Sequence, residues 1–372
     1  MANMFFSIPD VYSGNNAIMS LRRFSSKRVA IVTDAFMVSS GKVQDLIDVM
    51  PEASVSIFSD VKPDPGVDVL KDGAIRFKAF KPEVIIALGG GSSQDAAKGI
   101  KVTLEEHYGD HCIELVSVPT TSGSGSEVTS YAVISDTENG QKYPLVSPDL
   151  LPDSAILDPQ LVLSVPRQIS ADTGMDVLTH AIEALVSTGA NDFSNALAEK
   201  AITLTICYLP KIFVDEKDIS AREHMHNASC MAGMAFNSAG LGLVHGMAHA
   251  IGGMLHIPHG KINAMLLPVV IEFNSETNDP DILACYNVCA RMMSISESSE
   301  ARGIQKLTDK IRSLNQQFGI PSTLTELGKS RDELESVRAL IIESALSDGC
   351  TETNPRKPTV SDVNRLFSRI VG

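Results

Sequence analysis

Hydrophobic residues in the first 160 positions gather in short continuous runs, and stretches with helical spacing separate these runs. The runs are rich in β-branched residues and occupy residues 29–33, 55–58, 84–88 and 115–118. Continuous rather than alternating apolar character is typical of strands in a parallel sheet that is covered on both faces. Residues 40–50 and 67–80 have helical spacing between the runs, so the pattern predicts a doubly wound, nucleotide-binding α/β domain.

After Pro166 the hydrophobic pattern becomes helical. Helical spacing recurs, with few strand-like runs between, at residues 172–186, 194–209, 221–235 and 303–318. Pro159 and Pro166 bracket a short connection between the two patterns. The sequence therefore predicts a dinucleotide-binding α/β domain with a Rossmann-like parallel sheet over residues 1–162 and an all-α domain over residues 163–372.

Composition narrows the class of protein. The 372 residues are 44% hydrophobic, which is enough to bury a core in each domain. The 45 acidic residues outnumber the 31 basic ones, and the formal charge of -14 argues against nucleic acid and membrane surfaces as partners. No segment holds 18 uncharged apolar residues in a row, and the first residues do not resemble a signal peptide, so we expect a cytoplasmic protein.

Six cysteines are scattered along the chain and do not form the dense pattern of a disulfide-stabilised domain. We expect them to be reduced and mostly buried. Cys285 and Cys289 would share a helix face, but a metal site needs more ligands nearby, so we interpret them as packing residues.

A glycine-rich turn follows the third apolar run. Residues 84–88 lead directly into Gly89, Gly90, Gly91, Ser92 and Ser93, and helical spacing follows. This order lets backbone N–H groups approach a pyrophosphate at the positive end of a helix. The turn matches neither G-x-G-x-x-G nor the Walker A pattern, so a purely structural turn is an alternative. Ser92 with Asp95 also fits a simple helix cap.

Two further polar positions follow apolar runs. Asp34 comes after residues 29–33, where a carboxylate could accept hydrogen bonds from the adenosine ribose and disfavour a 2′-phosphate; a turn residue facing solvent is the alternative. Residues 119–127 are rich in hydroxyl groups and glycine after the run at 115–118, where ligands bind in parallel sheets, although such segments are also common linkers.

The second half contains a candidate metal site. Asp176 and His180 are spaced i, i+4, which places them on one helix face, as either a metal site or a buried His–Asp contact would require. Four of the nine histidines then fall within 15 residues, at His245, His249, His256 and His259. One carboxylate with several imidazoles suits Zn²⁺ or Fe²⁺, but the spacing alone does not select among these histidines.

These segments together resemble the iron-containing, or group III, alcohol dehydrogenases. This family includes lactaldehyde (1,2-propanediol) oxidoreductase and the propanol and ethanol dehydrogenases of propanediol and ethanolamine utilisation. The resemblance extends over nearly the whole chain. It rests on the segments IVTD (31–34), GGGSSQDAAK (89–98), PTTSGSGSEVT (119–129), GMDVLTHAIEA (174–184), GLGLVHGMAHAIGG (240–253), IPHG (257–260) and TNPR (353–356).

The resemblance implies a role for each matching position. Metal binding would fall on Asp176, His180, His245 and His259. His249 would lie beside the nicotinamide, as a candidate proton relay or as a structural neighbour, and His256 matches no functional position. Cofactor contacts would fall on Asp34, Gly90, Gly91, Ser92, Ser93, Asp95, Thr120, Thr121, Ser122, Ser124, Val133 and Lys142.

One position departs from part of the family. Asp64 stands in KPDP (62–65), where some members that resemble this chain carry Asn. A second acid near the adenosine site would further disfavour NADPH, and a plain turn residue is the alternative.

The implied function is a metal-dependent alcohol dehydrogenase that interconverts a short-chain alcohol and its aldehyde, for example propanol and propanal or ethanol and acetaldehyde. We expect Fe²⁺, with Zn²⁺ as the alternative, and NAD(H) in preference to NADP(H). A divalent cation favours deprotonation of an alcohol hydroxyl, which lets a hydride pass to nicotinamide. The resemblance also implies a homodimer, and association with a bacterial microcompartment is a further hypothesis.

Two other functions are compatible with the same fold. One is a metal-dependent dehydrogenase of polyols such as glycerol or propanediol. The other is a lyase resembling dehydroquinate synthase, whose phosphorylated acid substrate would call for more Lys and Arg than residues 172–260 contain.

Overall fold

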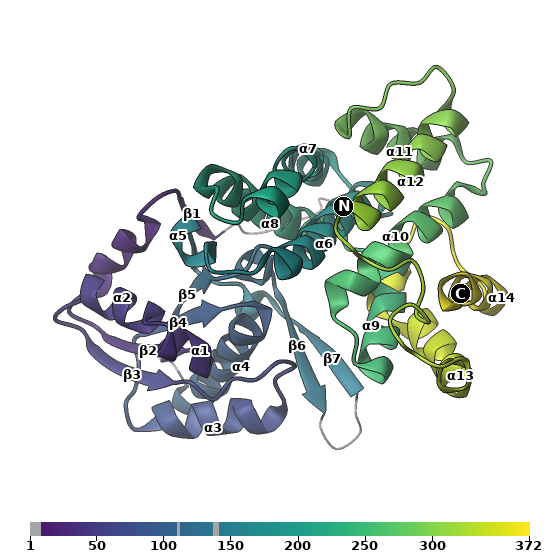
Figure 1. The fold of residues 1–372 in the computed structure, drawn as a ribbon. Coiled ribbons are helices and arrows are strands. Elements are labelled where there is room, and N and C mark those ends of the chain that lie inside the picture. The colour runs from purple at the N-terminus through teal and green to yellow at the C-terminus, as the bar shows by residue number, and fades with distance from the viewer. Residues whose placement is uncertain (1–8, 110–111, 137–140) are drawn as a thin grey trace. The chain divides into compact units, whose positions relative to one another are not determined.

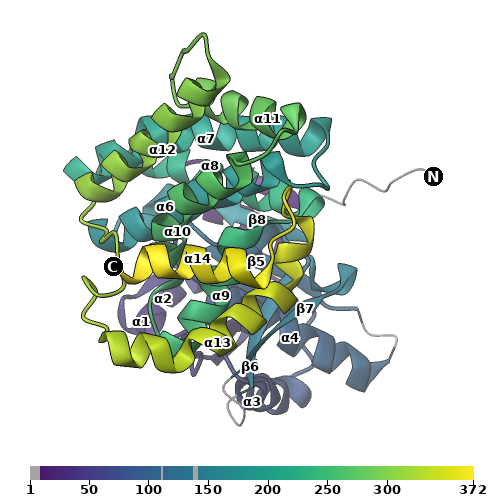
Figure 2. The ribbon, with the colours of Figure 1, turned by 90° about the vertical axis from the view of Figure 1, so that its right-hand side faces the viewer.

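The chain forms two compact units in a computed structural model that describes residues 9–109, 112–136 and 141–372 (Figures 1 and 2). By their contacts, one unit consists of Met1–Val165 with Glu216–Gly233, and the other of Pro166–Asp215 with Met234–Gly372. The helix α8 (Ile219–Ala239) therefore supplies residues to both units. The division into domains 1–162 and 163–372 stays a prediction.

A six-stranded parallel sheet forms the centre of the first unit, as the apolar runs predict. Its spatial order is β1-β8-β5-β4-β2-β3, and every pairing is parallel. The strands are β1 (Asp10–Ser13), β2 (Arg28–Val32), β3 (Ser54–Phe58), β4 (Val84–Gly89), β5 (Glu114–Pro119) and β8 (Ser154–Leu157). The predicted Rossmann-like architecture is confirmed for this unit.

Helices cover both faces of this sheet, which explains why its strands are apolar throughout. Alternate residues of β2 point to opposite faces: Ala30 and Val32 join one core cluster, and Val29 and Ile31 join the other. The first cluster contains α3 (Val67–Lys78) and α4 (Gly91–Tyr108). The second contains the 3₁₀ helix η1 (Ala17–Phe24), α1 (Ala35–Ser39), α2 (Lys42–Val49) and α5 (Pro159–Val162).

Sequence patterns did not predict the antiparallel hairpin of β6 (Tyr131–Asp136) and β7 (Gln141–Val146), which is visible as a separate pair of arrows in Figure 1. The strand β7 is polar at its start, so it lacks the continuous apolar run that marks the buried strands. The short strands β1 and β8 were also missed. Short 3₁₀ helices, η2 (Ser126–Val128) and η3 (Pro148–Leu150), flank the hairpin.

The second unit is helical, and no strand occurs among residues 166–372, all of which are described. This confirms the predicted all-α half. Its elements, apart from the end of α8, are α6 (Arg167–Val186), α7 (Asp192–Val214), α9 (Leu243–Leu255), α10 (His259–Ser275), α11 (Pro280–Met292), α12 (Glu300–Gln317), α13 (Arg331–Ser347), η4 (Gly349–Thr353) and α14 (Val360–Val371).

The helix α6 is the central helix of this unit. Every residue from Gly174 to Val186 is buried, so the helix is covered on all sides rather than along one stripe. Its neighbour α7 begins at a capping box, in which Asn191 and Ser194 satisfy each other's backbone N–H groups. Among the described residues, no helix combines the length and the apolar character that a membrane crossing needs.

All six cysteines are free, as expected from their scattered positions. The expectation that most are buried was wrong. Only Cys230 and Cys289 are buried, whereas Cys112 and Cys207 are exposed. Helical spacing does not reveal which face of a helix such as α7 meets solvent.

Candidate active site

One face of the buried helix α6 carries the acidic residue and the first histidine of the candidate metal site. Asp176 and His180 are one helical turn apart, and both are buried. The Oδ1 atom of Asp176 lies 3.9 Å from Nε2 of His180. The i, i+4 spacing thus places both donor atoms on the same side of α6, as the sequence predicts.

Two further imidazoles reach the same carboxylate from α9 and α10. Nε2 of His245 lies 3.7 Å from Oδ1 of Asp176, and Nε2 of His259 lies 3.9 Å from it. The ring of His245 stacks on that of His180 with 4.6 Å between centroids, and its centroid is 5.2 Å from that of His259. The structure therefore brings together all four residues implied as metal ligands.

The geometry and chemistry of this cluster fit a divalent metal. A tetrahedral ion with bonds of about 2.1 Å holds neighbouring ligand atoms about 3.4 Å apart, slightly closer than the three distances from Oδ1 of Asp176 to the imidazole nitrogens. One carboxylate with three imidazoles and no thiolate suits Fe²⁺ or Zn²⁺. The ligand atoms of Asp176, His180 and His245 all lie within 4.8 Å of one another, and His259 stands outside that group. Binding by all four residues therefore needs His259 to move inward and the Nδ2 atom of Asn263, which lies between Asp176, His245 and His259, to move away.

Electrostatics in the cluster favour a charged Asp176 beside a protonated His245, whereas burial and the neighbouring histidines hold the pKa of His259 well below its ordinary value. Burial by itself would raise the pKa of Asp176, but the charges of His180 and His259 lower it well below its ordinary value. Burial by itself would lower the pKa of His245, but hydrogen bonds with Asp176 and Glu183 raise it to about 9. A bound cation would satisfy the same carboxylate and release the proton of His245.

Sequence reasoning missed an amide in this cluster. Nδ2 of Asn263 donates to Oδ1 of Asp176 over 2.6 Å and lies 3.1 Å and 3.0 Å from the Nε2 atoms of His245 and His259. Asn263 is fully buried, one turn after His259 on α10. Its i, i+4 spacing from His259 was the signal that could have revealed it.

His249 lies beside the cluster, and an aspartate from a distant segment holds it. Its Nδ1 is 2.9 Å from Oδ2 of Asp348, and its ring stacks on that of His259 with 5.2 Å between centroids. Asp348 is close in space but about 100 residues away in sequence, so no spacing could have predicted this pair. His256 is exposed and ends α9 in the left-handed conformation, with φ of 52°. It takes no part in the cluster.

Three candidate cofactor segments follow neighbouring strands of the first unit. The strand β4 pairs with β2 on one side and with β5 on the other (Figure 1). Asp34, the glycine turn at 89–91 and the segment from Thr120 to Ser124 therefore all lie at the carboxyl edge of the sheet. The chain runs from β2 outward to β3 and then returns to β4, so the strand order reverses here. This is the position at which open α/β sheets bind ligands.

The glycine turn allows two loops to approach more closely than side chains would permit. A Cβ atom on Gly90 would lie 3.3 Å from Oγ1 of Thr121, and one on Gly91 would lie 3.2 Å from Oγ of Ser124. Gly89 has φ of 148°, which disfavours other residues. The helix α4 starts after Gly90 without a side-chain cap. Its first N–H groups are therefore not used by a capping side chain.

The interpretation of Ser92 and Asp95 as a helix cap was wrong, because the carboxylate of Asp95 makes other contacts. It accepts hydrogen bonds from Oγ of Ser126 over 2.7 Å and from N of Val133 over 3.0 Å. Both partners belong to the polar segment after β5 or to β6. Asp95 thus links α4 to the neighbouring loop. Ser92 is half-buried and Ser93 is buried in the first turn of α4.

Asp34 caps a helix and lies near the glycine turn. Its Oδ1 accepts hydrogen bonds from the backbone N of Phe36 and Met37, over 2.8 Å and 3.0 Å, at the start of α1. Its Oδ2 lies 3.7 Å from where a Cβ of Gly89 would be. One oxygen is therefore fixed, and the other faces the candidate cofactor site.

The remaining predicted cofactor residues lie in the same region of the first unit. Thr120 is buried, and its N donates to O of Gly89. Oγ of Ser122 lies 3.0 Å from Nδ1 of His226, a buried histidine that the sequence did not single out. Ser122 is thus held by the part of α8 that belongs to this unit. The side chain of Lys142 lies outside the described residues.

Asp64 is exposed and adopts φ of 55°. Asp and Asn tolerate this left-handed conformation better than most residues. The turn fits a plain turn residue, and an effect of Asp64 on the choice between NADH and NADPH stays a prediction.

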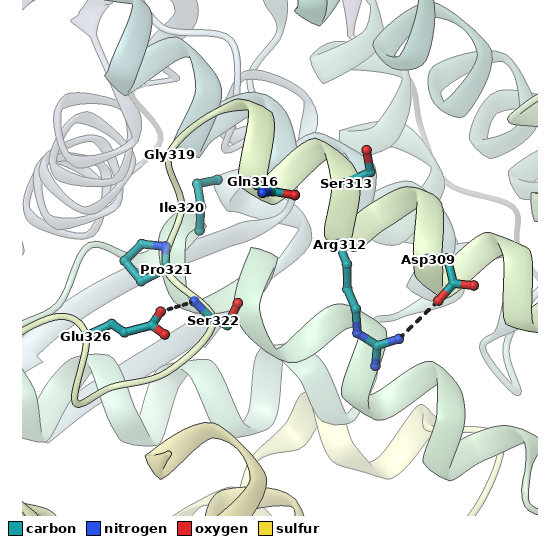
Figure 3. A pocket seen from close by; sticks show the side chains of 9 residues that line it. All are labelled: Asp309, Arg312, Ser313, Gln316, Gly319, Ile320, Pro321, Ser322 and Glu326. Atoms are coloured by element: carbon teal, nitrogen blue, oxygen red, sulfur yellow. Dashed lines mark hydrogen bonds and ion pairs between the residues drawn. The ribbon is translucent and has the colours of Figure 1, made fainter.

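A surface depression of about 640 Å³ in the second unit lies between α12 and the loop that follows it (Figure 3). Its charged groups already have partners: Arg312 pairs with Asp309 and Glu272, and Glu326 accepts from N of Ser322. The depression contains none of the candidate site residues.

Comparison with known families decides the identity of this arrangement. Residues 9–159 match the family described as iron-containing alcohol dehydrogenase, and residues 170–371 match the C-terminal region of the Fe-containing alcohol dehydrogenase family. The chain belongs to the iron-containing alcohol dehydrogenase family. Membership implies an iron ion and a nicotinamide cofactor, and it confirms the resemblance seen in the sequence.

Individual relatives of this iron-containing alcohol dehydrogenase cover nearly its whole length. The 1-propanol dehydrogenase PduQ of Salmonella typhimurium is 41% identical over 99% of this chain and 100% of its own. The NADPH-dependent butanol dehydrogenase of Clostridium saccharobutylicum is 36% identical over 98% and 97%. A crystal structure of a 1,3-propanediol oxidoreductase superposes with a TM-score of 0.92 at 34% identity, over 99% and 100%. The protein is therefore an oxidoreductase that interconverts alcohols and aldehydes.

Proposed function

We propose that this alcohol dehydrogenase binds one Fe²⁺ ion through Asp176, His180, His245 and His259 and acts on short-chain alcohols and aldehydes with NAD(H). The convergence of one carboxylate and three imidazoles carries the proposal. When bound, the ion would act as a Lewis acid on the substrate oxygen. The names of the propanol and butanol dehydrogenase relatives support a short aliphatic substrate.

The chain's own residues supply the remaining chemistry. Oxidation of an alcohol moves a hydride from the carbinol carbon to C4 of the nicotinamide and releases the hydroxyl proton. His249 is the candidate for carrying that proton. Asp348 accepts from its Nδ1, which leaves Nε2 available, and the side chain is 29% exposed, so the proton has a route to solvent.

In the first unit, backbone groups would bind the cofactor phosphates. The uncapped start of α4 offers N–H groups and a positive helix dipole to the pyrophosphate. The cofactor residues Gly90, Gly91, Thr121 and Ser124 border this point. Both Fe²⁺ and Zn²⁺ suit the donor set, so the choice of Fe²⁺ in this proposal rests on family membership.

Metal analysis with a substrate panel tests this function. Anaerobically purified protein should contain about one iron per chain and oxidise NADH with acetaldehyde, propanal or butanal, as followed by NADH absorbance. Chelator-treated protein should be inactive, and Fe²⁺ should restore it. Full turnover by metal-free protein, or no turnover with any of these aldehydes, would contradict the proposal.

The preference for NAD(H) rests on Asp34, because family membership alone does not decide it: one relative is named NADPH-dependent. The free Oδ2 of Asp34 faces the glycine turn, where it would accept a hydrogen bond from the adenosine ribose and repel a 2′-phosphate.

Replacing Asp34 with serine should therefore raise the ratio of kcat/KM with NADPH to that with NADH by about tenfold or more, since the repulsion between two close charges near a protein surface exceeds the roughly 1.4 kcal/mol that corresponds to tenfold. Serine removes the charge but still caps α1, so stability should change little. Asp64→Asn, which removes a charge but keeps a residue that tolerates φ of 55°, is the comparison: an unchanged ratio would identify Asp64 as a plain turn residue, and a raised ratio as a second acid near the adenosine site. An unchanged ratio for Asp34→Ser would remove Asp34 from the adenosine site.

The homodimer, the cytoplasmic location and association with a bacterial microcompartment stay predictions. Similarity to a PduQ protein supports a role in propanol metabolism, and size-exclusion chromatography would test the dimer.

A further inference from the structure

The start of α9 depends on residues from other helices. This helix carries His245 and His249, yet it begins after Gly242 and has no side-chain cap of its own. The first N–H groups of a helix lack partners inside the helix, and a buried one must find a partner elsewhere. Leu243 and Val244 are both buried, so bulk solvent does not reach these groups.

Two distant side chains supply the missing caps. Oε1 of Glu183, on α6, accepts from N of Val244 over 2.7 Å, and Oδ1 of Asn354 accepts from N of Leu243 over 3.1 Å. Glu183 is 4% exposed and Asn354 is 1% exposed. A carboxylate at a helix N-terminus also interacts favourably with the helix dipole.

The second oxygen of Glu183 contacts the imidazole of His245. Its Oε2 lies 2.5 Å from Nδ1 of that ring. A carboxylate only accepts hydrogen bonds, so the hydrogen must reside on Nδ1. Nε2 of His245 is the atom that faces Asp176, at 3.7 Å. One carboxylate therefore fixes the start of α9 and the direction of a ligand atom that the helix carries.

Gly242 allows both acceptors to approach. A Cβ atom there would lie 2.8 Å from Oε1 of Glu183 and 3.0 Å from Oδ1 of Asn354. The backbone of Gly242 is extended, with φ of -156°, so its conformation does not require glycine. Glycine is required there because the two capping side chains occupy the space that a Cβ atom would need.

The segment around Asn354 is itself held in place. Nδ2 of Asn354 donates to Oδ1 of Asn274 over 2.8 Å and to O of Arg356 over 2.6 Å. Oγ1 of Thr353 donates to O of Leu241 over 2.7 Å. The TNPR segment thus wraps the start of α9 and ties it to α10, which carries His259. This gives a physical role to a motif that the candidate site leaves unused.

We propose that Glu183 and Asn354 are positioning residues that fix the start of α9 and so hold Nε2 of His245 in the metal-binding position. The proposal rests on the proposed metal ligands, because it gives the caps a function only if His245 binds the ion. Glu183 acts on the helix start and on the imidazole, whereas Asn354 acts on the helix start alone. A purely structural pair would alter stability without altering metal affinity.

The variant Glu183→Gln separates these roles. Glutamine has nearly the same shape, but its single oxygen can occupy only one of the two carboxylate oxygen positions, which accept separately from N of Val244 and Nδ1 of His245. If it keeps the helix cap, its NH₂ group faces Nδ1 and drives the hydrogen to Nε2, which then cannot bind a metal. Asn354→Ala removes one cap and leaves the contact between Glu183 and His245 intact.

The test measures the affinity of the metal-stripped full chain for Fe²⁺, by anaerobic competition with a chromophoric chelator and corrected for the folded fraction. We expect Glu183→Gln to weaken binding about 10–100-fold, which is typical when the partner of a metal-bound histidine is lost, and Asn354→Ala to weaken it less. Glu272→Gln, which removes a paired carboxylate on α10 away from the cluster, is the control and should bind Fe²⁺ normally.

His245→Ala distinguishes failure of this inference from failure of the proposed site. If His245→Ala loses Fe²⁺ but Glu183→Gln binds it with normal affinity, the positioning role is overturned and the ligand set stands. If His245→Ala itself retains normal affinity, the ligand set fails and the positioning role fails with it. A lower unfolding temperature with unchanged affinity in Glu183→Gln also overturns the positioning role.

Discussion

Replacing His259 with alanine is expected to leave the purified protein without metal and to lower kcat/KM for propanal reduction by about 10³-fold or more. His259 supplies one of three imidazoles around Asp176. The Lewis acidity of a bound metal contributes several kcal/mol to the reaction, and each 1.4 kcal/mol corresponds to about tenfold in rate. Metal analysis and NADH absorbance measure the two effects on the same sample.

His256→Asn is the matched control, three residues earlier. His256 is exposed and has φ of 52°, a conformation that asparagine tolerates, so this variant should keep its metal and its activity. Retention of metal and of full activity by His259→Ala would show that the ion is bound elsewhere.

Replacing Gly260 with alanine should destabilise the second unit and weaken metal binding together. A Cβ atom at this position would overlap the backbone carbonyl of Asp172 and lie 3.3 Å from Cβ of Asp176. A backbone atom of α6 cannot move aside cheaply, so α10 must shift away from α6, and His259 must shift with it. Overpacking of this kind costs about 1–3 kcal/mol. Denaturant unfolding of metal-free protein and Fe²⁺ competition measure the two effects.

Gly253→Ala provides a control in which the stability of the protein should rise instead of fall. Gly253 lies inside α9, and a Cβ atom there would meet nothing within 4 Å. Alanine should raise helix stability by about 0.5–1 kcal/mol without changing metal affinity. If Gly260→Ala matched Gly253→Ala in both measurements, the close approach of α6 and α10 would not constrain the site.

The parts of this site that local spacing encodes could be predicted from the sequence. Asp176 and His180 share a helix face because they are four residues apart, and Asp34 follows an apolar run that forms β2. The same rule, that residues three, four or seven positions apart share a helix face, also applies to two site residues that the sequence patterns did not predict. Glu183 lies seven residues after Asp176, and Asn263 four residues after His259, so both occupy the ligand face of their helices.

Contacts between distant segments could not be predicted in this way. Asp348 and Asn354 reach α9 from about 100 residues away, and His226 reaches Ser122 across a similar separation. Asp95 is an example in which local spacing gave the wrong partner. Its position fits a cap of the helix start, but its carboxylate instead accepts hydrogen bonds from Ser126 and Val133. Where a side chain has several possible partners, tertiary packing decides which one it contacts. Local sequence patterns therefore do not predict such contacts.

The parallel sheet has a consequence for the order in which the chain folds during synthesis. Among the described strands, β1 pairs only with β8, so Asp10 cannot pair until Ser154 has been synthesised. At about 5–20 residues per second, the ribosome takes roughly 7–30 s to make the intervening chain. During this interval β1 is an unpaired strand on a nascent chain, a species that is prone to aggregate. Its short length and its two polar side chains, Asp10 and Ser13, limit that hazard.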